Sequence, residues 1–475
     1  MALTSFEYLI FFPLAFLLYW LFFNRSSKSQ NVFILAASLI FYGFWDIRFL
    51  ALLLFTAFST YYIGLAIDRN HSNTSKSKCL LWLSIILNIG ILFYFKYFNF
   101  FVDSFYEFLK LVDINVNNNS TLRIILPVGI SFYTFSALSY TIDIFQNKTK
   151  PVNDIFAYLA YVTFFPAILS GPISRSTEQL PQFLAKREFD YDMAIKATKA
   201  ILWGAFMKLC VADNIGTYVD TVYSKIEQHN GTTFYLTAIL YSIQIYADFA
   251  GYSLMAIGSG NLLGIKLQTN FIRPYFSKTV TEFWRKWHIS LTTWFRDYIY
   301  FPLGGNRVSK IRWIFNTMIV FTISGLWHGA AYTFVIWGAL HGACMVIERF
   351  IYGDKIKSIN NKISISNIAR VILTFNIVTF AWIFFRVNSL SDAIYVIQSI
   401  FTDHGKPFID IPVFMLSFMS IFIMVVKDFL DEKNIKFSLL DNKNMALRWI
   451  TCVILICYIL LFGALNGGSF IYFKF

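Results

Sequence analysis

Long apolar runs separated by short polar loops make up most of this 475-residue sequence. They lie near residues 6–23, 32–45, 49–67, 79–101, 124–145, 154–170, 198–212, 233–253, 313–328, 331–351, 368–386, 411–428 and 446–465. A helix needs about 20 mainly apolar residues to cross a bilayer, so the shorter runs are expected to be tilted, re-entrant or extended by amphipathic flanks. The pattern predicts an all-α, polytopic integral membrane protein with about eleven transmembrane helices and additional re-entrant or interfacial helices.

Basic residues gather in every second loop between these runs. Arg25 and Lys28 follow the first run, Lys148 and Lys150 follow the fifth, and residues 433–448 hold four more. Positive loops stay in the cytoplasm, so both termini are predicted to lie outside. The first run has no basic segment before it and no small-residue cleavage site, so we expect a retained span rather than a cleaved signal.

The composition excludes an ordinary soluble protein. The chain is 57% hydrophobic and 14% charged, whereas soluble domains carry about 25% charged residues. The net charge of +13 comes from membrane loops, and without a basic soluble domain we expect no nucleic-acid partner. The five cysteines show no metal-ligand spacing and are expected to be buried small hydrophobes, so no metal is predicted. We expect one membrane domain over residues 1–475, with residues 240–350 richest in motifs.

The segment 258–312 interleaves basic residues with tryptophans. Within it, residues 281–288 place aromatic side chains at helical spacing beside a basic face. This pattern is typical of a helix that lies in the membrane interface or dips into the bilayer. A simple anchoring helix is the alternative interpretation.

Three of the six histidines, His288, His328 and His341, lie among apolar segments. Ionisable groups at bilayer depth are costly and indicate function. His328 stands among small residues in 324–331, which we expect to admit a ligand close to the backbone. A neutral imidazole there could take the proton of a hydroxyl that attacks a thioester, in a site that excludes water. The alternative, that His328 only packs in a helix contact, remains open. For His341, packing is the preferred interpretation.

Several motifs resemble the bacterial branch of the membrane-bound O-acyltransferase family. They are Glu282–Leu291, Trp294–Gly305, Leu326–Ala331, Pro127–Tyr133 and Phe164–Ile173. This branch includes membrane subunits that O-acetylate alginate or peptidoglycan, and the D-alanyl transfer protein of teichoic acids. The resemblance covers essentially the whole chain and implies the fold of that family, in the bacterial cytoplasmic membrane. On this similarity His328 matches the catalytic histidine, and His288 matches a second polar position upstream.

The resemblance also implies a donor and partners. Acetyl-CoA is the expected acyl donor, used as a substrate with no permanently bound cofactor, and it would dock on the basic 266–312 face. The residues expected to contact it are Trp284, Arg285, Trp287, Arg296 and Trp327. The acetyl group would pass to an extracytoplasmic SGNH-type acetyltransferase and then to a polysaccharide. The sequence does not identify this polysaccharide.

The last ten residues, 466–475, form a glycine hinge followed by an aromatic tail. A free terminus is normally polar, so this tail is expected to enter an apolar site. It resembles the aromatic C-terminus of the small partner in the D-alanylation system, which implies that Tyr472 relays the acyl group. The alternative is that the tail anchors the last helix at the outer interface.

Three other functions stay open at this point. The first is transfer of a D-alanyl or other acyl group to a cell-envelope polymer. The second is a membrane transporter of a different class, for which Asp143 and Asp248 would be the intramembrane acids. The third is a scaffold within a polysaccharide secretion complex, in which His328 would be dispensable.

Overall fold

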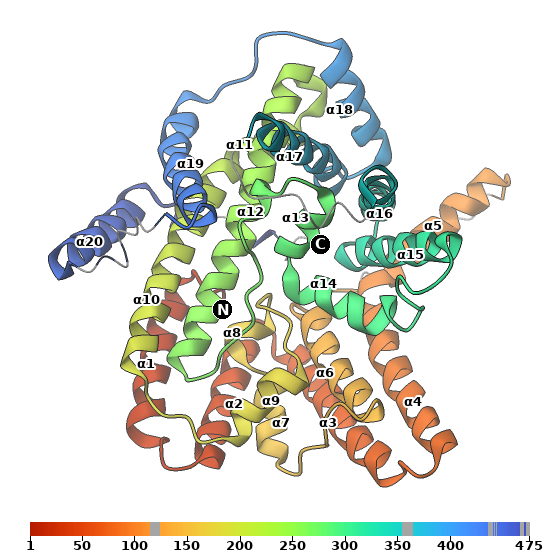
Figure 1. Cartoon of the computed structure of the whole chain (residues 1–475), viewed down its shortest axis with the longest axis vertical. Helices are drawn as coiled ribbons and strands as arrows, with labels where there is room; N and C mark the ends of the chain where they lie inside the picture. Colours follow the sequence, from red (N-terminus) through yellow and green to blue (C-terminus); the bar gives the residue numbers. More distant parts are fainter. Residues whose placement is uncertain are drawn as a thin grey trace. The chain divides into compact units, whose positions relative to one another are not determined.

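The computed structural model describes residues 1–114, 124–353, 364–435, 440, 442, 444–465 and 470–471, and within these ranges it contains helices and no strands (Figure 1). Tyr472, the glycines 467 and 468, and the basic residues Lys436 and Lys443 lie outside the described residues. The chain divides into two compact units. The single membrane domain expected from the sequence stays a prediction.

The first unit comprises residues 1–201 and 255–268. Its helices are α1 (Phe6–Phe22), α2 (Ser27–Gly43), α3 (Ile47–Arg69), α4 (Thr74–Leu92), η1 (Phe93–Tyr97), α5 (Phe98–Leu111), α6 (Ile130–Phe145), α7 (Ile155–Val162), α8 (Phe165–Ile168), α9 (Ser176–Leu184) and most of α10 (Tyr191–Ala205). A buried arginine joins several of them, because the Arg187 guanidinium donates to Tyr19 Oη at 2.8 Å and to Asn31 Oδ1 at 2.9 Å. Asp143, on α6, accepts a hydrogen bond from Ser176 Oγ.

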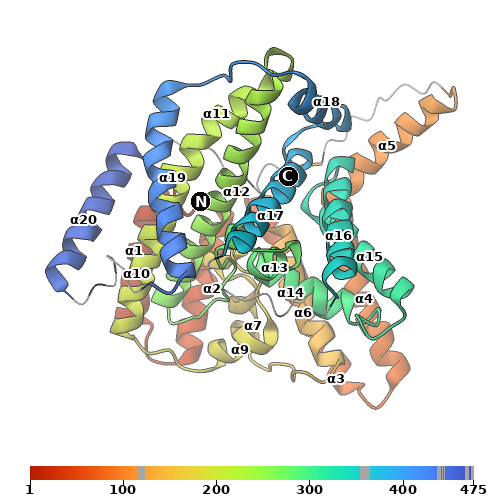
Figure 2. The same ribbon diagram turned by 45° about the horizontal axis from the view of Figure 1, so that its top comes forward.

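The second unit comprises residues 202–254 and 269–475. Its elements are η2 (Phe206–Ala212), α11 (Asp213–Ser224), η3 (Ile226–Gln228), the larger part of α12 (Gly231–Leu262), η4 (Pro274–Phe276), α13 (Val280–Lys286), α14 (Ile289–Phe295), η5 (Arg296–Tyr300), α15 (Lys310–His328), α16 (Tyr332–Tyr352), α17 (Ile365–Arg386), α18 (Leu390–Thr402), α19 (Ile411–Glu432) and α20 (Met445–Phe462). Helices α15 and α16 pack side by side (Figure 2). All three candidate histidines belong to this unit.

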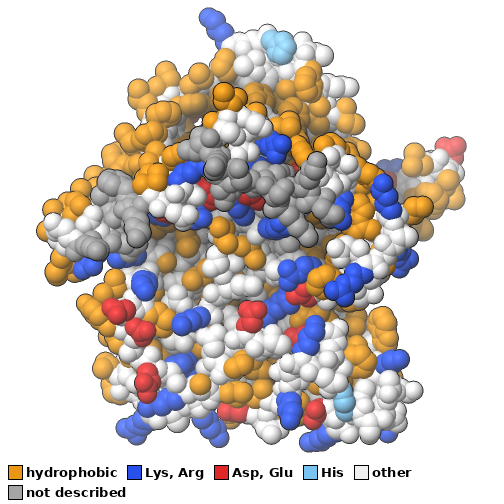
Figure 3. All heavy atoms as spheres, viewed as in Figure 1, with side chains coloured by type: hydrophobic (Ala, Val, Ile, Leu, Met, Phe, Trp, Pro, Cys, Tyr) orange, Lys and Arg blue, Asp and Glu red, His pale blue; other side chains and the backbone are white. Residues whose placement is uncertain are grey.

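The helices follow the apolar runs closely. Six are long and apolar enough to cross a membrane in the described part of the chain. They are Ile47–Arg69, Thr74–Leu111, Tyr332–Tyr352, Ile365–Arg386, Ile411–Glu432 and Met445–Phe462. Large apolar side chains cover the outer faces of α19 and α20, including Met415, Phe418 and Leu461 (Figure 3). The chain is therefore an all-α, multi-pass membrane protein, while the expected count of about eleven crossings stays a prediction.

The central basic segment differs from the single helix expected over 281–288. Helix α13 ends at Lys286, and His288 then takes a left-handed backbone conformation, with φ of 42°, before α14 begins. Non-glycine residues seldom adopt this region, and those that do often belong to functional sites. The break turns the aromatic face inward, so that Trp284 and Trp287 are buried in the core of the second unit.

Candidate active site

Two histidines from different helices meet in the interior of the second unit. His328 is the last residue of α15 and is 2% exposed, while His288 precedes α14 and is 0% exposed. Their ring centroids lie 6.5 Å apart and the rings are nearly perpendicular. The two imidazoles are therefore close neighbours in the interior of this unit.

Aromatic rings surround His328 and exclude water from it. Trp327, Trp337 and Phe385 place their ring centroids 4.9, 5.0 and 5.4 Å from that of His328. His288 in turn contacts Phe249, at 4.6 Å. An apolar enclosure of this kind disfavours a charged imidazolium and strengthens any hydrogen bond made inside it. The arrangement suits a neutral general base.

His341 lies in the same aromatic cluster but has a structural contact. Its Nδ1 accepts a hydrogen bond from Trp284 Nε1 at 3.3 Å, and its ring lies 5.0 Å from that of Trp337. These contacts agree with the packing interpretation of this residue. His341 therefore packs against Trp337, whose ring in turn contacts that of His328.

The glycines beside His328 do not leave room for a ligand, so that part of the sequence-based reasoning was wrong. A Cβ atom on Gly325 would lie 2.2 Å from the carbonyl oxygen of Phe334, and one on Gly329 would lie 2.1 Å from the Phe334 ring. A Cβ on Gly338 would likewise meet the carbonyl of Phe321. The glycines permit close packing of α15 on α16, which fixes the position of His328 at the end of its helix.

The described part of the C-terminal tail is buried near the histidines. Phe470 is 2% exposed and packs against Tyr252 and Phe249, and the Phe249 ring also contacts His288. The backbone N–H of Ile471 donates to Asp248 Oδ2 at 2.8 Å. Burial of these two residues agrees with a tail that enters the protein. Tyr472, the next residue, lies outside the described residues, so its role stays a prediction.

Asp248, which accepts the hydrogen bond from the tail, belongs to a buried triad of ion-paired side chains. Lys208 Nζ lies 2.8 Å from Asp248 Oδ1 and 2.7 Å from Asp213 Oδ1, and all three side chains are buried. Lys208 belongs to the π-helix η2, a helix type often found at functional sites. Asp248, considered above as a transport acid, thus has its charge balanced by a lysine.

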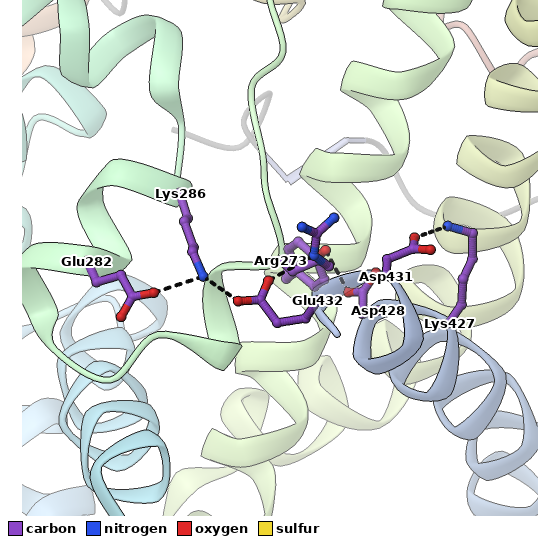
Figure 4. A network of polar contacts seen from close by, with 8 residues as sticks. Arg273, Glu282, Lys286, Lys427, Asp428, Asp431 and Glu432 are labelled. Atoms are coloured by element: carbon purple, nitrogen blue, oxygen red, sulfur yellow. Dashed lines mark hydrogen bonds and ion pairs between the residues drawn. The ribbon is translucent and has the colours of Figure 1, made fainter. Parts of the chain in front are cut away.

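Two cations of the basic segment, Arg273 and Lys286, belong to an ion-pair network (Figure 4). Lys286 Nζ lies 2.9 Å from both Glu282 Oε1 and Glu432 Oε1, and Arg273 Nε lies 2.9 Å from Glu432 Oε2. Burial is the main cause that lowers the pKa of the neighbouring Lys278 from its ordinary value. The network connects the loop before α13 to the end of α19.

The residues expected to contact the donor separate into two groups. Trp284, Trp287 and Trp327 are buried in the aromatic interior. Arg285 and Arg296 lie nearer the surface, and Arg296 forms an ion pair with Asp297 at 2.8 Å. The structure therefore does not bring the five residues onto one face.

Sequence reasoning missed a polar cavity of about 250 Å³ in the second unit. Arg386, the last residue of α17, lines it and forms an ion pair with Asp220 at 2.7 Å. The same cavity is lined by Tyr241, Gln244 and Thr333. Both residues were visible in the sequence, but their pairing could not be predicted, because they lie 166 residues apart along the chain.

Comparison with known proteins identifies the family. A family model described as MBOAT, the membrane-bound O-acyltransferase family, matches residues 39–389. The chain is 36% identical over 381 residues to a Pseudomonas syringae pv. tomato protein named probable alginate O-acetylase AlgI, covering 80% of this chain and 71% of the relative. It is 33% identical over 416 residues to the peptidoglycan O-acetyltransferase of Helicobacter pylori, covering 82% and 77%.

A third relative differs in the acyl group that its name specifies. The chain is 29% identical over 313 residues to the teichoic acid D-alanyltransferase of Streptococcus thermophilus, covering 60% of this chain and 74% of the relative. The family match includes both histidines of the buried pair. This chain therefore belongs to the membrane-bound O-acyltransferase family and is a membrane-bound acyltransferase.

Proposed function

We propose that this protein transfers an acetyl group from cytoplasmic acetyl-CoA, across the bacterial cytoplasmic membrane, for O-acetylation of a cell-envelope polysaccharide. The observation that carries the proposal is the buried pair of His288 and His328 in a chain of this family. The names of two relatives, a probable alginate O-acetylase and a peptidoglycan O-acetyltransferase, support acetylation of alginate, peptidoglycan or another envelope polysaccharide.

His328 is the general base of the proposed reaction. It takes the proton from an attacking hydroxyl while the hydroxyl oxygen forms a bond to the thioester carbon. The carbon–sulfur bond then breaks, and the thiol of CoA leaves with a proton. His288, across the 6.5 Å separation, would hold the acyl carbonyl or the proton in transit. The surrounding rings keep water from hydrolysing the acyl group.

The donor would enter from the cytoplasmic side along the basic segment. Arg285 is exposed and makes no ion pair or hydrogen bond with any described residue, so it is available to a phosphate. Lys286 and Arg273 already have carboxylate partners and would have to exchange them. The buried Trp284, Trp287 and Trp327 would contact the pantetheine arm, because an apolar interior suits that uncharged part of the donor.

The tail would carry the acyl group outward. In the first step the Tyr472 phenol attacks the thioester and releases the thiol, leaving an acetyl ester on the tyrosine. In the second step a hydroxyl of an extracytoplasmic SGNH-type partner attacks that ester and restores the phenol. Each hydroxyl needs a base, which His328 supplies in the first step. On the predicted topology the C-terminus lies outside, which would place the tail within reach of this partner.

A D-alanyl group is the second candidate for the transferred acyl group. The relative named a teichoic acid D-alanyltransferase supports it, at lower identity and coverage than the acetylases. The purified protein, reconstituted in membranes, can be supplied with labelled acetyl and D-alanyl donors in turn. Only the true donor should transfer its label to an acceptor.

Substitution of His328 tests the proposed function. We expect His328→Ala to lower acetyl transfer at least 100-fold, because general-base catalysis typically contributes about 10²–10⁴ in rate. His404→Ala, which changes a histidine in an exposed loop, is the matched control and should retain activity. Membrane yield and thermal stability should be close to the parent for both variants. Near-normal acetylation by a well-folded His328→Ala protein would refute the proposal.

A further inference from the structure

The polar cavity of the second unit has the properties of a ligand site. It lies between α11, α12, the start of α16 and the residues that follow α17, and Ile471 of the tail forms part of its wall. Its volume of about 250 Å³ is that of about eight water molecules in the liquid. This is room for one sugar ring rather than for a length of polymer.

Three buried polar atoms at this cavity have no hydrogen-bond partner within the described ranges. They are the hydroxyls of Tyr241 and Thr333 and the side-chain oxygen of Gln244. Tyr241 is 1% exposed and Thr333 is 2% exposed, so bulk water does not reach them. A buried polar group without a partner is costly, and a hydroxyl-bearing ligand in this cavity would supply partners to all three atoms.

The remaining lining specifies the chemistry of that ligand. Arg386 and Asp220 form an ion pair, so together they add no net charge to the wall. Helix α16 begins here without a side-chain cap, and the positive end of its dipole favours an oxygen atom. Hydroxyl groups both donate and accept hydrogen bonds, as this mixture of hydroxyls, amide oxygen and helix end requires.

The cavity also lies next to the catalytic pair. Phe334 lines it, the Phe334 ring lies 4.8 Å from that of Phe385, and the Phe385 ring lies 5.4 Å from that of His328. Two aromatic rings in succession, those of Phe334 and Phe385, thus connect the wall of the cavity to the proposed base. On the charge pattern of the loops, the end of α17 is on the outer side, where the acceptor arrives.

We propose that this cavity binds a neutral, hydroxyl-rich ligand, a single pyranose unit of the polysaccharide that is the final acceptor, through Tyr241, Gln244 and Thr333. This inference rests on the proposed function, in which the polysaccharide receives the acetyl group only after the tail and the extracytoplasmic partner have carried it. It adds a docking position for the final acceptor that is distinct from the histidines, and it predicts that hydroxyl groups rather than ring shape determine binding.

Protection of a cysteine placed at the cavity tests this assignment without any acyl transfer. Asn388, an exposed residue of the lining, is changed to Cys in full-length protein whose five native cysteines are replaced by alanine. The rate of maleimide labelling is measured in nanodiscs with methyl β-D-glucopyranoside as the probe. Tetrahydropyran, which has the same ring without hydroxyls, is the matched control probe. We expect the glucoside to slow labelling at least threefold and tetrahydropyran to leave the rate unchanged.

Variants then connect the protection to the named residues. We expect Thr333→Val and Tyr241→Phe each to raise the half-protecting glucoside concentration about fivefold, the effect of one typical hydrogen bond. Tyr223→Phe is the control, because this buried hydroxyl also has no partner among the described residues but does not line the cavity. The assignment is overturned if the glucoside gives no protection, if tetrahydropyran protects equally, or if all three variants behave alike.

The same assay separates this inference from the proposed function. His328→Ala should lose acetyl transfer and keep the protection by glucoside, since His328 does not line the cavity. If His328→Ala loses acetyl transfer but the glucoside does not protect the parent protein from labelling, the catalytic role of His328 stands and the acceptor site is rejected. Protection together with an active His328→Ala protein would support the acceptor site and reject the proposed base.

Discussion

Removing the charge of Asp248 should release the C-terminal tail from its docked position. Asp248 accepts the Ile471 backbone N–H at 2.8 Å and is paired with Lys208 at 2.8 Å. The substitution Asp248→Leu removes both interactions at a similar side-chain size. A hydrogen bond to a charged group contributes about 1.5–3 kcal/mol, and each 1.4 kcal/mol is a factor of ten. The ratio of docked to undocked tail should therefore fall about 10- to 150-fold.

The aromatic contacts of the tail limit the effect. Phe470 stacks on Tyr252 with centroids 4.6 Å apart and meets Phe249 edge-on at 5.6 Å. Such pairs contribute about 0.5–1.5 kcal/mol each beyond the area that they bury, so the tail should loosen without leaving permanently. Lys208 keeps Asp213 as a partner, which protects the fold from an unpaired buried charge.

Hydrogen exchange at the Ile471 amide, followed by mass spectrometry of the C-terminal peptide, measures the release directly. We expect faster exchange in Asp248→Leu by the factor given above, with acetyl transfer reduced in parallel. Asp213→Asn is the control, because it perturbs the same lysine but does not contact Ile471. If the Ile471 amide exchanges at the parent rate in Asp248→Leu, the hydrogen bond does not hold the tail and the reasoning fails.

Two further predictions concern topology and the relay. A single cysteine introduced beside Arg307 should resist impermeant maleimide added to intact cells, because basic loops stay in the cytoplasm; ready labelling from outside would refute both the topology and the donor route. Tyr472→Phe keeps the aromatic bulk and removes the hydroxyl, so the relay predicts loss of polysaccharide acetylation. Acetylation at the parent rate would instead favour a tail that only anchors the last helix.

Much of the secondary structure could be predicted because it depends on local composition. Each apolar run became one or more helices, and Lys310–His328 and Tyr332–Tyr352 match the runs 313–328 and 331–351 within a few residues. The amphipathic helices α9 and α18 were missed, because their mixed composition resembles that of loops. An apolar pattern reports which residues need lipid or protein around them, and it cannot report where a short helix breaks, as it does at His288.

The sequence by itself singled out the membrane histidines, since an ionisable group in an apolar run is conspicuous whatever the fold. Only the tertiary structure decided which residues share a site. Lys208 and Asp248 lie in different runs, and Arg386 lies 166 residues from Asp220, yet each pair is in contact. The role of Gly325 also depended on its neighbour, because only the approach of α16 shows that a Cβ would strike the Phe334 backbone. Such contacts are set by packing between distant segments, whereas sequence patterns record only the preference of each segment alone.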